Sequence, residues 1–191
     1  TFGFSGTNAH LVIDEFPLAA ETGSGAAERN QPVLFLLSAR SEERLAAYAA
    51  VMRDFIGAQP DLDLVAMAYT LQIGRHAMDH RLAICADSRQ TLLNGLATFT
   101  AQRPSEQVLV GRVRKSRGGT VILDGLADRE AVLSSWLDVS ASGDVGAVSR
   151  AMKQLAELWV QGLDMEWPRL YGAVTADGGS IPRRLRLPGY P

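Results

Sequence analysis

Apolar positions between residues 33 and 113 fall into short strand-like runs separated by longer helix-like stripes. Residues 33–37 form a continuous apolar run that is too short for a helix, which predicts a buried strand. Segments 81–86 and 108–113 are two further strand candidates, and 121–123 is a weaker one. We therefore expect a small three-stranded sheet built from 33–37, 81–86 and 108–113.

Helical periodicity separates these strand candidates. Ser41 is placed to cap a helix whose apolar residues recur every three and four positions and which ends near Gly57. A second helix is expected from about Asp61 to Gly74, and a third after the capping residue Ser88. The expected fold class is α+β, a small sheet covered mainly on one face by helices.

The C-terminal part predicts helices followed by an extended strip. A short helix around 129–137 and a longer one over 145–161, closed by Gly162, should pack alongside the sheet. In 181–191 leucines alternate with arginines and prolines exclude a helix: Pro182, Arg184, Leu185, Arg186, Leu187, Pro188 and Pro191. This period of two predicts an extended strip laid on another surface.

Composition narrows the class of protein. The 191 residues, 47% of them apolar, can bury one compact core, and the apolar-poor segment 18–31 predicts a linker. Nineteen Lys and Arg against 21 Asp and Glu give a net charge of −2, which provides no general attraction to nucleic acid or membrane. The single cysteine, Cys85, cannot form an internal disulfide, which fits a reducing cytoplasm. No apolar run approaches the ~20 residues of a membrane helix.

Three motifs suggest chemistry, and each has a structural alternative. Ser5 lies in a turn that resembles a nucleophile elbow but lacks its final glycine, and with His10 it gives a remote hypothesis of a small serine hydrolase. His76 and His80 have the spacing of zinc ligands on a helix, yet Gly74 should end the helix before them. We expect no catalytic, metal-binding or cofactor-binding residues in this chain.

Two basic clusters are the candidate partner contacts: Arg112, Arg114, Lys115 and Arg117, and then Arg183, Arg184 and Arg186. They are either solvated surface charge or a local site for an acidic partner, for which arginine provides a bidentate donor. Nucleic acid is not expected, because no aromatic residues are interleaved with these arginines. Trp136, Trp159 and Trp167 are interpreted as core anchors rather than ligand platforms.

Sequence motifs at both ends of the chain resemble a known family. Residues 1–17, TFGFSGTNAHLVIDEFP, resemble the C-terminal end of the ketosynthase domains of polyketide synthases. Residues 68–75, AYTLQIGR, resemble the adaptor or flanking subdomain that follows such ketosynthases. Residues 155–162 and 182–191 are similar to the strip that ends this region and returns to the ketosynthase.

The resemblance implies a division of the chain into four parts. Residues 1–17 would be the last ketosynthase strand, left without its parent sheet, and 18–31 a linker. Residues 32–143 would be the flanking subdomain, and 144–191 a helix with a wrapping linker. Both ends are expected to be cuts within a longer polypeptide. The sequence departs from the family at His76, His80 and Gly189, where acidic residues and threonine are usual.

The resemblance also implies a function. Only residues 115 to about 143, at the end of this flanking subdomain, lie where related synthases carry a built-in acyltransferase domain, and they are too few to form one. The region therefore resembles the acyltransferase docking domain of a trans-acyltransferase synthase, without catalytic residues because those of the ketosynthase lie upstream of Thr1. The implied partners are a free-standing acyltransferase, an acyl carrier protein with its phosphopantetheine, and the parent ketosynthase. A passive spacer or a lateral contact between ketosynthases is the alternative.

Overall fold

The computed structural model describes residues 32–113, 131, 134–136, 139, 144–163, 165–176 and 181–191. Among these residues, three antiparallel strands form one sheet in the order β1-β2-β3. The strands are β1 (Val33–Ala39), β2 (His80–Ala86) and β3 (Val108–Arg112), so β2 is central and pairs with both neighbours. All three expected strands and the α+β class are confirmed.

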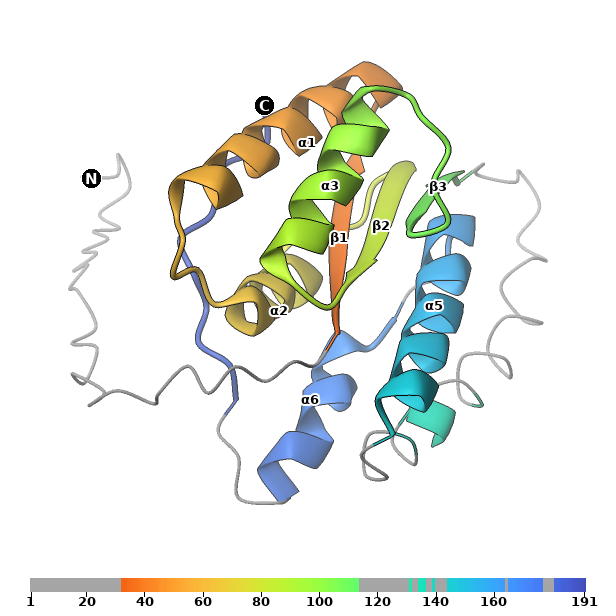
Figure 1. Cartoon of the computed structure of the whole chain (residues 1–191). Helices are drawn as coiled ribbons and strands as arrows, with labels where there is room; N and C mark the ends of the chain where they lie inside the picture. The colour runs from red at the N-terminus through yellow and green to blue at the C-terminus, as the bar shows by residue number, and fades with distance from the viewer. Residues whose placement is uncertain are drawn as a thin grey trace, which may run out of the picture.

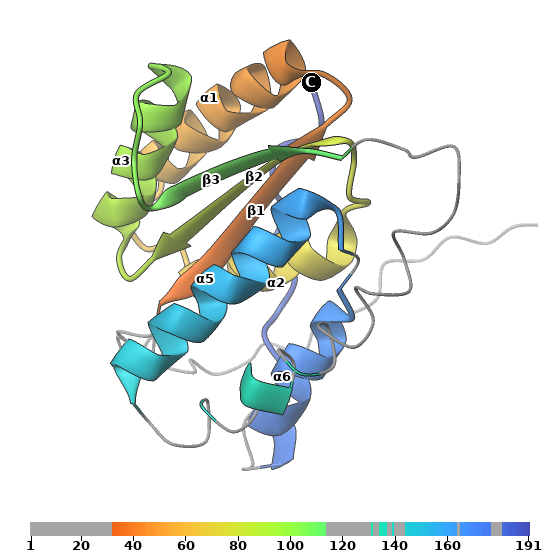
Figure 2. The same cartoon turned by 90° about the vertical axis from the view of Figure 1, so that its right-hand side faces the viewer.

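Helices lie on both faces of this sheet (Figures 1 and 2). On one face are α1 (Glu42–Ala58) and α3 (Arg89–Thr100), and α2 (Leu64–Gly74) packs against β1. On the other face α5 (Val145–Gln161) packs across all three strands. Helix α6 (Trp167–Ala176) follows α5 and contacts α2.

The expectation that helices cover mainly one face of the sheet is therefore wrong. Phe35 and Leu37 belong to a core shared with α1, α2 and α3, whereas Leu34 and Leu36 belong to a second core formed with α5 and α6. Successive side chains of a strand point to opposite faces, so an uninterrupted apolar strand needs a cover on each. The continuous run in β1 was the signal for this two-sided burial.

Local capping fixes where the helices begin and end. The hydroxyl of Ser41 accepts the amide of Arg44, and that of Ser88 accepts the amide of Thr91, as expected for two N-caps. The second helix begins at Leu64 and not near Asp61, because Asp63 takes the cap position and its carboxylate accepts two backbone amides. Gly162 ends α5 with φ +114°, a conformation that favours glycine.

The C-terminal strip, residues 181–191, is extended as predicted and runs past α2 and α1 (Figure 1). The amide of Leu185 donates to Oγ1 of Thr70 on α2 at 2.9 Å. Leu185 and Leu187 pack against the core beneath α1 and α2. The leucines of the alternating pattern thus hold the strip against the first core.

Several sequence predictions fall wholly or partly outside the described residues. These are the ketosynthase-like strand at 1–17, the weak strand at 121–123 and most of the short helix at 129–137. Within that last segment, Ala131 and residues 134–136 are helical, and Trp136 is buried in the second core. No helix in the described part of the chain is long and apolar enough to span a bilayer.

Candidate partner-binding surface

The end of the C-terminal strip is tied to α1 and to the end of α2. The Pro188 carbonyl accepts from the Tyr48 hydroxyl at 3.5 Å and from the Arg75 guanidinium at 3.1 Å. The Tyr190 hydroxyl accepts the amide of Arg40 at 3.1 Å, and its ring lies edge-to-face with Tyr48, with centroids 6.1 Å apart. These contacts hold the strip in one path across the domain.

A final contact secures the last residue. The guanidinium of Arg44 on α1 donates to the carbonyl of Pro191 at 2.6 Å and lies 6.0 Å from the ring centroid of Tyr190. Sequence reasoning missed Arg40, Arg44 and Arg75 as strip contacts because they lie more than 110 residues from it. Only the terminal alternation signalled that some surface would receive the strip.

The arginines of the strip point away from this attachment. Arg183, Arg184 and Arg186 are exposed, and none forms an ion pair with a described residue. Free guanidinium groups on a fixed backbone can accept a carboxylate or phosphate without first breaking an internal salt bridge. These three predicted contact residues therefore form one basic surface, which we call the arginine strip.

The first predicted basic cluster is not part of the arginine strip. Arg112 is exposed on β3, whereas the strip attaches to α1 and α2, next to β1 at the opposite edge of the sheet. Arg114, Lys115 and Arg117 lie outside the described residues. In the described part of the chain, Arg183, Arg184 and Arg186 thus form one surface, and Arg112 lies apart from it.

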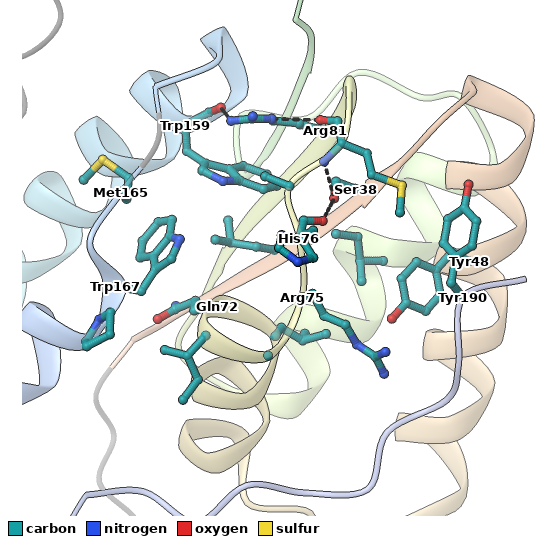
Figure 3. A pocket seen from close by; sticks show the side chains of 18 residues that line it. Ser38, Tyr48, Gln72, Arg75, His76, Arg81, Trp159, Met165, Trp167 and Tyr190 are labelled. Carbon is teal, nitrogen blue, oxygen red and sulfur yellow. Dashed lines mark hydrogen bonds between the residues drawn. The ribbon is translucent and has the colours of Figure 1, made fainter. Parts of the chain in front are cut away.

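Beside the end of the strip lies an open cavity of 620 Å³ (Figure 3). It is bounded by β1, by the segment after α2 that contains Arg75 and His76, and by Trp159, Met165 and Trp167 from α5 and the start of α6. Tyr190 at the end of the strip completes its rim. Residues separated by more than 100 positions in sequence meet here, which no local pattern predicts.

Two polar side chains, one from the buried Arg81 and one from the partly exposed Ser38, support the walls of this cavity. Arg81 donates to the carbonyls of Met78, Trp159 and Leu163, and its guanidinium lies 5.0 Å from the ring centroid of Trp159. The hydroxyl of Ser38 donates to the carbonyl of His76 and accepts the amide of Met78, as the dashed lines in Figure 3 show. These bonds fix the segment 75–78 against the sheet.

The described titratable groups do not assemble a catalytic or metal centre. His76 is exposed in a loop and His80 begins β2, so the two do not share a helix. No group of three or more His, Cys, Asp or Glu among the described residues is arranged to hold a metal ion. Ser5 and His10, the hydrolase hypothesis, lie outside the described residues.

The thiol of Cys85 on β2 is a poor nucleophile. Burial raises its pKa to about 11, an effect that Lys153 partly offsets and Glu157 reinforces. Burial also raises the pKa of Tyr171, whose hydroxyl donates to the side-chain oxygen of Gln72 at 2.7 Å. Trp136, Trp159 and Trp167 are buried, as expected of core anchors, and Trp159 and Trp167 also line the cavity, which that interpretation did not foresee.

Comparison with known proteins places this fold. Residues 36–103 match the RhiE-like, KS-MAT linker domain family. The whole chain aligns with polyketide synthases PksL and PksN of Bacillus subtilis (strain 168), at 38% and 34% identity, and spans only 4% and 3% of their lengths. The structure resembles the ketosynthase from module 6 of the bacillaene synthase from Bacillus subtilis 168, with a TM-score of 0.67 and 38% identity.

That structural match covers 84% of this chain and 27% of the ketosynthase chain. The described helices and sheet are thus a recurrent unit of ketosynthase structures, larger than the family segment 36–103 alone. The chain is therefore similar to a linker region that adjoins the ketosynthase in polyketide synthases.

Proposed function

We propose that this chain is a non-catalytic scaffold and docking region of a trans-acyltransferase polyketide synthase module. In this role it fixes the ketosynthase relative to neighbouring carrier proteins and offers the arginine strip to a free-standing acyltransferase. The observation that carries the proposal is the strip itself. Leu185 and Leu187 face the domain, whereas Arg183, Arg184 and Arg186 are exposed.

The short connection between β3 and α5 supports an acyltransferase that acts in trans. Strand β3 ends at Arg112 and α5 begins at Val145, and both pack on the same sheet. The residues between them are far fewer than the 100–200 of a typical independent domain. In this proposal the acyltransferase that serves the module binds from outside, which raises its local concentration near the carrier protein.

The carrier protein and its cofactor belong to the same proposal. The chain would bind no cofactor of its own, and the acyl group would travel on the phosphopantetheine arm of an acyl carrier protein. Carboxylates on either partner would be attracted to the arginine strip, mainly by faster association at low salt.

Calorimetric titration of the chain with its cognate acyltransferase tests the proposal. We expect saturable binding that weakens by roughly 3-fold to 150-fold when Arg183, Arg184 and Arg186 are all changed to Gln, because each exposed pair contributes ~0.2–1 kcal/mol. The matched control is Arg112→Gln, an exposed arginine on β3, which should leave the affinity unchanged. A flat trace at high micromolar concentration, or equal binding by the triple variant, contradicts docking through the strip.

A further inference from the structure

The floor of the cavity contains an open stretch of sheet edge. Next to the β2–β3 pair, the amide of Val113 donates to the carbonyl of Asp79. Because hydrogen-bonded positions alternate along an antiparallel pair, the backbone groups of the odd-numbered residues of β2 bond to β3 and those of the even-numbered residues bond to β1. The register of β1 with β2 then directs the backbone groups of Leu34, Leu36 and Ser38 away from the sheet. Three alternate positions of β1 therefore have backbone groups that do not bond to β2.

Two of these three positions are covered by the rest of the domain. The carbonyl of Leu34 accepts the side-chain amide of Gln72 at 2.8 Å. Ser38 is covered by the segment 76–78. Its hydroxyl donates to the carbonyl of His76 and accepts the amide of Met78. Leu36 lies between them and lines the cavity, and no described residue outside the sheet bonds to its backbone. An edge amide facing a cavity is a site where an extended peptide can pair.

The rim of the cavity is basic. Arg75 and His76 are exposed on it, Arg81 lies beneath, and none of the lining residues is Asp or Glu. Arg75 uses one guanidinium nitrogen to bind the Pro188 carbonyl, which leaves its other donors available. The rim therefore favours a carboxylate.

The cavity also has an apolar and aromatic part. Trp159, Trp167, Met165, Leu71, Ile73 and Met78 line it, together with the polar side chains of Ser38 and Gln72. A volume of 620 Å³ accommodates one or two large side chains together with the backbone that carries them. A buried apolar anchor surrounded by a polar rim is the usual anatomy of a protein–protein contact.

We infer that this cavity receives a short extended segment of a partner protein in which an acidic residue stands next to a large apolar one. The apolar side chain fills the space beside Trp159 and Trp167, the carboxylate binds Arg75 and His76, and the backbone of the segment pairs with Leu36. This surface is separate from the arginine strip. The two sites therefore give independent results when tested.

Two blocked tetrapeptides added to the isotope-labelled full chain test the inference: acetyl-Ala-Glu-Leu-Ala-amide and its neutral analogue with Gln in place of Glu. We expect the acidic peptide to shift the indole N–H resonances of Trp159 and Trp167 saturably, with a dissociation constant of the order of 1 mM. The Gln peptide should bind several-fold more weakly at low salt, and the difference should shrink as salt is added. Equal binding of the two peptides, or no saturable shift, overturns the inference.

Variants separate the charge of Arg75 from its structural role. Arg75→Gln removes the rim charge and a bond to Pro188, whereas Tyr48→Phe removes a bond to the same carbonyl and leaves the charge in place. We expect Arg75→Gln and His76→Gln to abolish the preference for the acidic peptide and Tyr48→Phe to retain it. Equal losses in Arg75→Gln and Tyr48→Phe would assign the effect to the strip path and overturn the inference.

The triple Gln variant of the arginine strip distinguishes this site from acyltransferase docking. It should bind the acidic peptide as the unchanged chain does, because its arginines do not line the cavity. Loss of the peptide preference in that variant would overturn the cavity as the site. Resonance shifts that depend on protein concentration without peptide would assign the cavity to a second copy of the chain and also overturn the inference.

Discussion

At the residue scale, Gly111 on β3 lies directly against the backbone of α5 at Val160. A Cβ at this position would overlap the carbonyl of Val160 and lie 2.9 Å from its Cβ. Both obstacles belong to or adjoin helix backbone, so they cannot move aside as a flexible side chain could. We expect Gly111→Ala to lower the free energy of unfolding by about 1–3 kcal/mol, measured by urea denaturation.

Gly57 provides the matched control for that substitution. It lies near the end of α1, and an added Cβ would meet nothing within 4 Å. Alanine there should leave stability unchanged or raise it by up to about 1 kcal/mol, because alanine favours the helix. Equal effects of the two substitutions would show that α5 does not sit against β3 as closely as described.

Cys85 should react slowly with alkylating reagents. Its pKa is raised from the ordinary 9.0 to about 11, so at pH 8 the thiolate fraction, and with it the rate of iodoacetamide reaction, falls about 100-fold. The rate should continue to rise towards pH 11 in the folded chain but level near pH 9 in denaturant. A native rate that also levels near pH 9 would contradict the raised pKa.

The same shift has a consequence for stability. Between pH 9 and about 11 the folded chain holds the Cys85 proton that the unfolded chain has released. Folding is then linked to proton uptake in that interval. The contribution of the protonated thiol is fully present below pH 9 and is lost as the pH rises to about 11.

Arg81 shows what residue patterns could not predict. In the sequence it alternates with Leu82 and Ile84, which suggests that it belongs to a solvent-facing side of the strand. In the structure it is 6% exposed, because α5 covers that face and supplies the carbonyl of Trp159 as a hydrogen-bond acceptor. A helix more than 60 positions away determines its environment, and strand periodicity contains no information about that helix.

At the scale of elements, the C-terminal strip depends on its two leucines. Substitution of Leu185 and Leu187 removes their apolar contacts with the first core and leaves in place the hydrogen bonds to the backbone of the strip. We expect the double variant Leu185→Ser, Leu187→Ser to weaken attachment by ~2 kcal/mol, or roughly 30-fold in the population of detached strip. Trypsin should then cut after Arg183, Arg184 or Arg186 correspondingly faster, followed by mass spectrometry.

Ile181→Ser is the control for the strip experiment. Ile181 is 57% exposed and is not part of the core contact, so its substitution should leave cleavage unchanged. If both variants are cleaved at the rate of the unchanged chain, the polar contacts of Tyr48, Arg44 and Arg75 hold the strip without its leucines. That result would contradict the assignment of the leucines as the anchor.

Sequence reasoning worked best for single elements and less well for their arrangement. The stripe along 145–161 and the stop at Gly162 located α5 correctly, because helix period and capping are local properties. The face of the sheet that α5 covers depends on Leu34 and Leu36, whose contacts are long-range. The cavity was not predictable for the same reason, since Arg75, Trp167 and Tyr190 meet only in the folded chain.

At the scale of the whole molecule, the linker family segment is smaller than the folding unit. Residues 36–103 contain β2, the second half of β1 and the helices of the first core, but not β3, α5, α6 or the strip. The second face of the sheet, with Leu34, Leu36 and Ala83, is buried by α5 and α6. A sheet face left open in this way exposes contiguous apolar surface to water.

We therefore expect residues 32–113, expressed alone, to lack a fixed native state. Deleting α5 removes the cover over Leu34, Leu36 and Ala83, and deleting the strip uncovers part of the first core. The fragment should bind the dye ANS strongly and unfold without a cooperative transition, whereas the full chain should bind little dye and unfold cooperatively. Adding residues 144–191 as a separate peptide should restore cooperative unfolding, because that peptide contains both α5, which covers the second core, and the strip, which covers part of the first core. A fragment that remains monomeric, excludes the dye and unfolds cooperatively would show that the first core alone sustains the fold, and that α5 and the strip are held to it only as attachments.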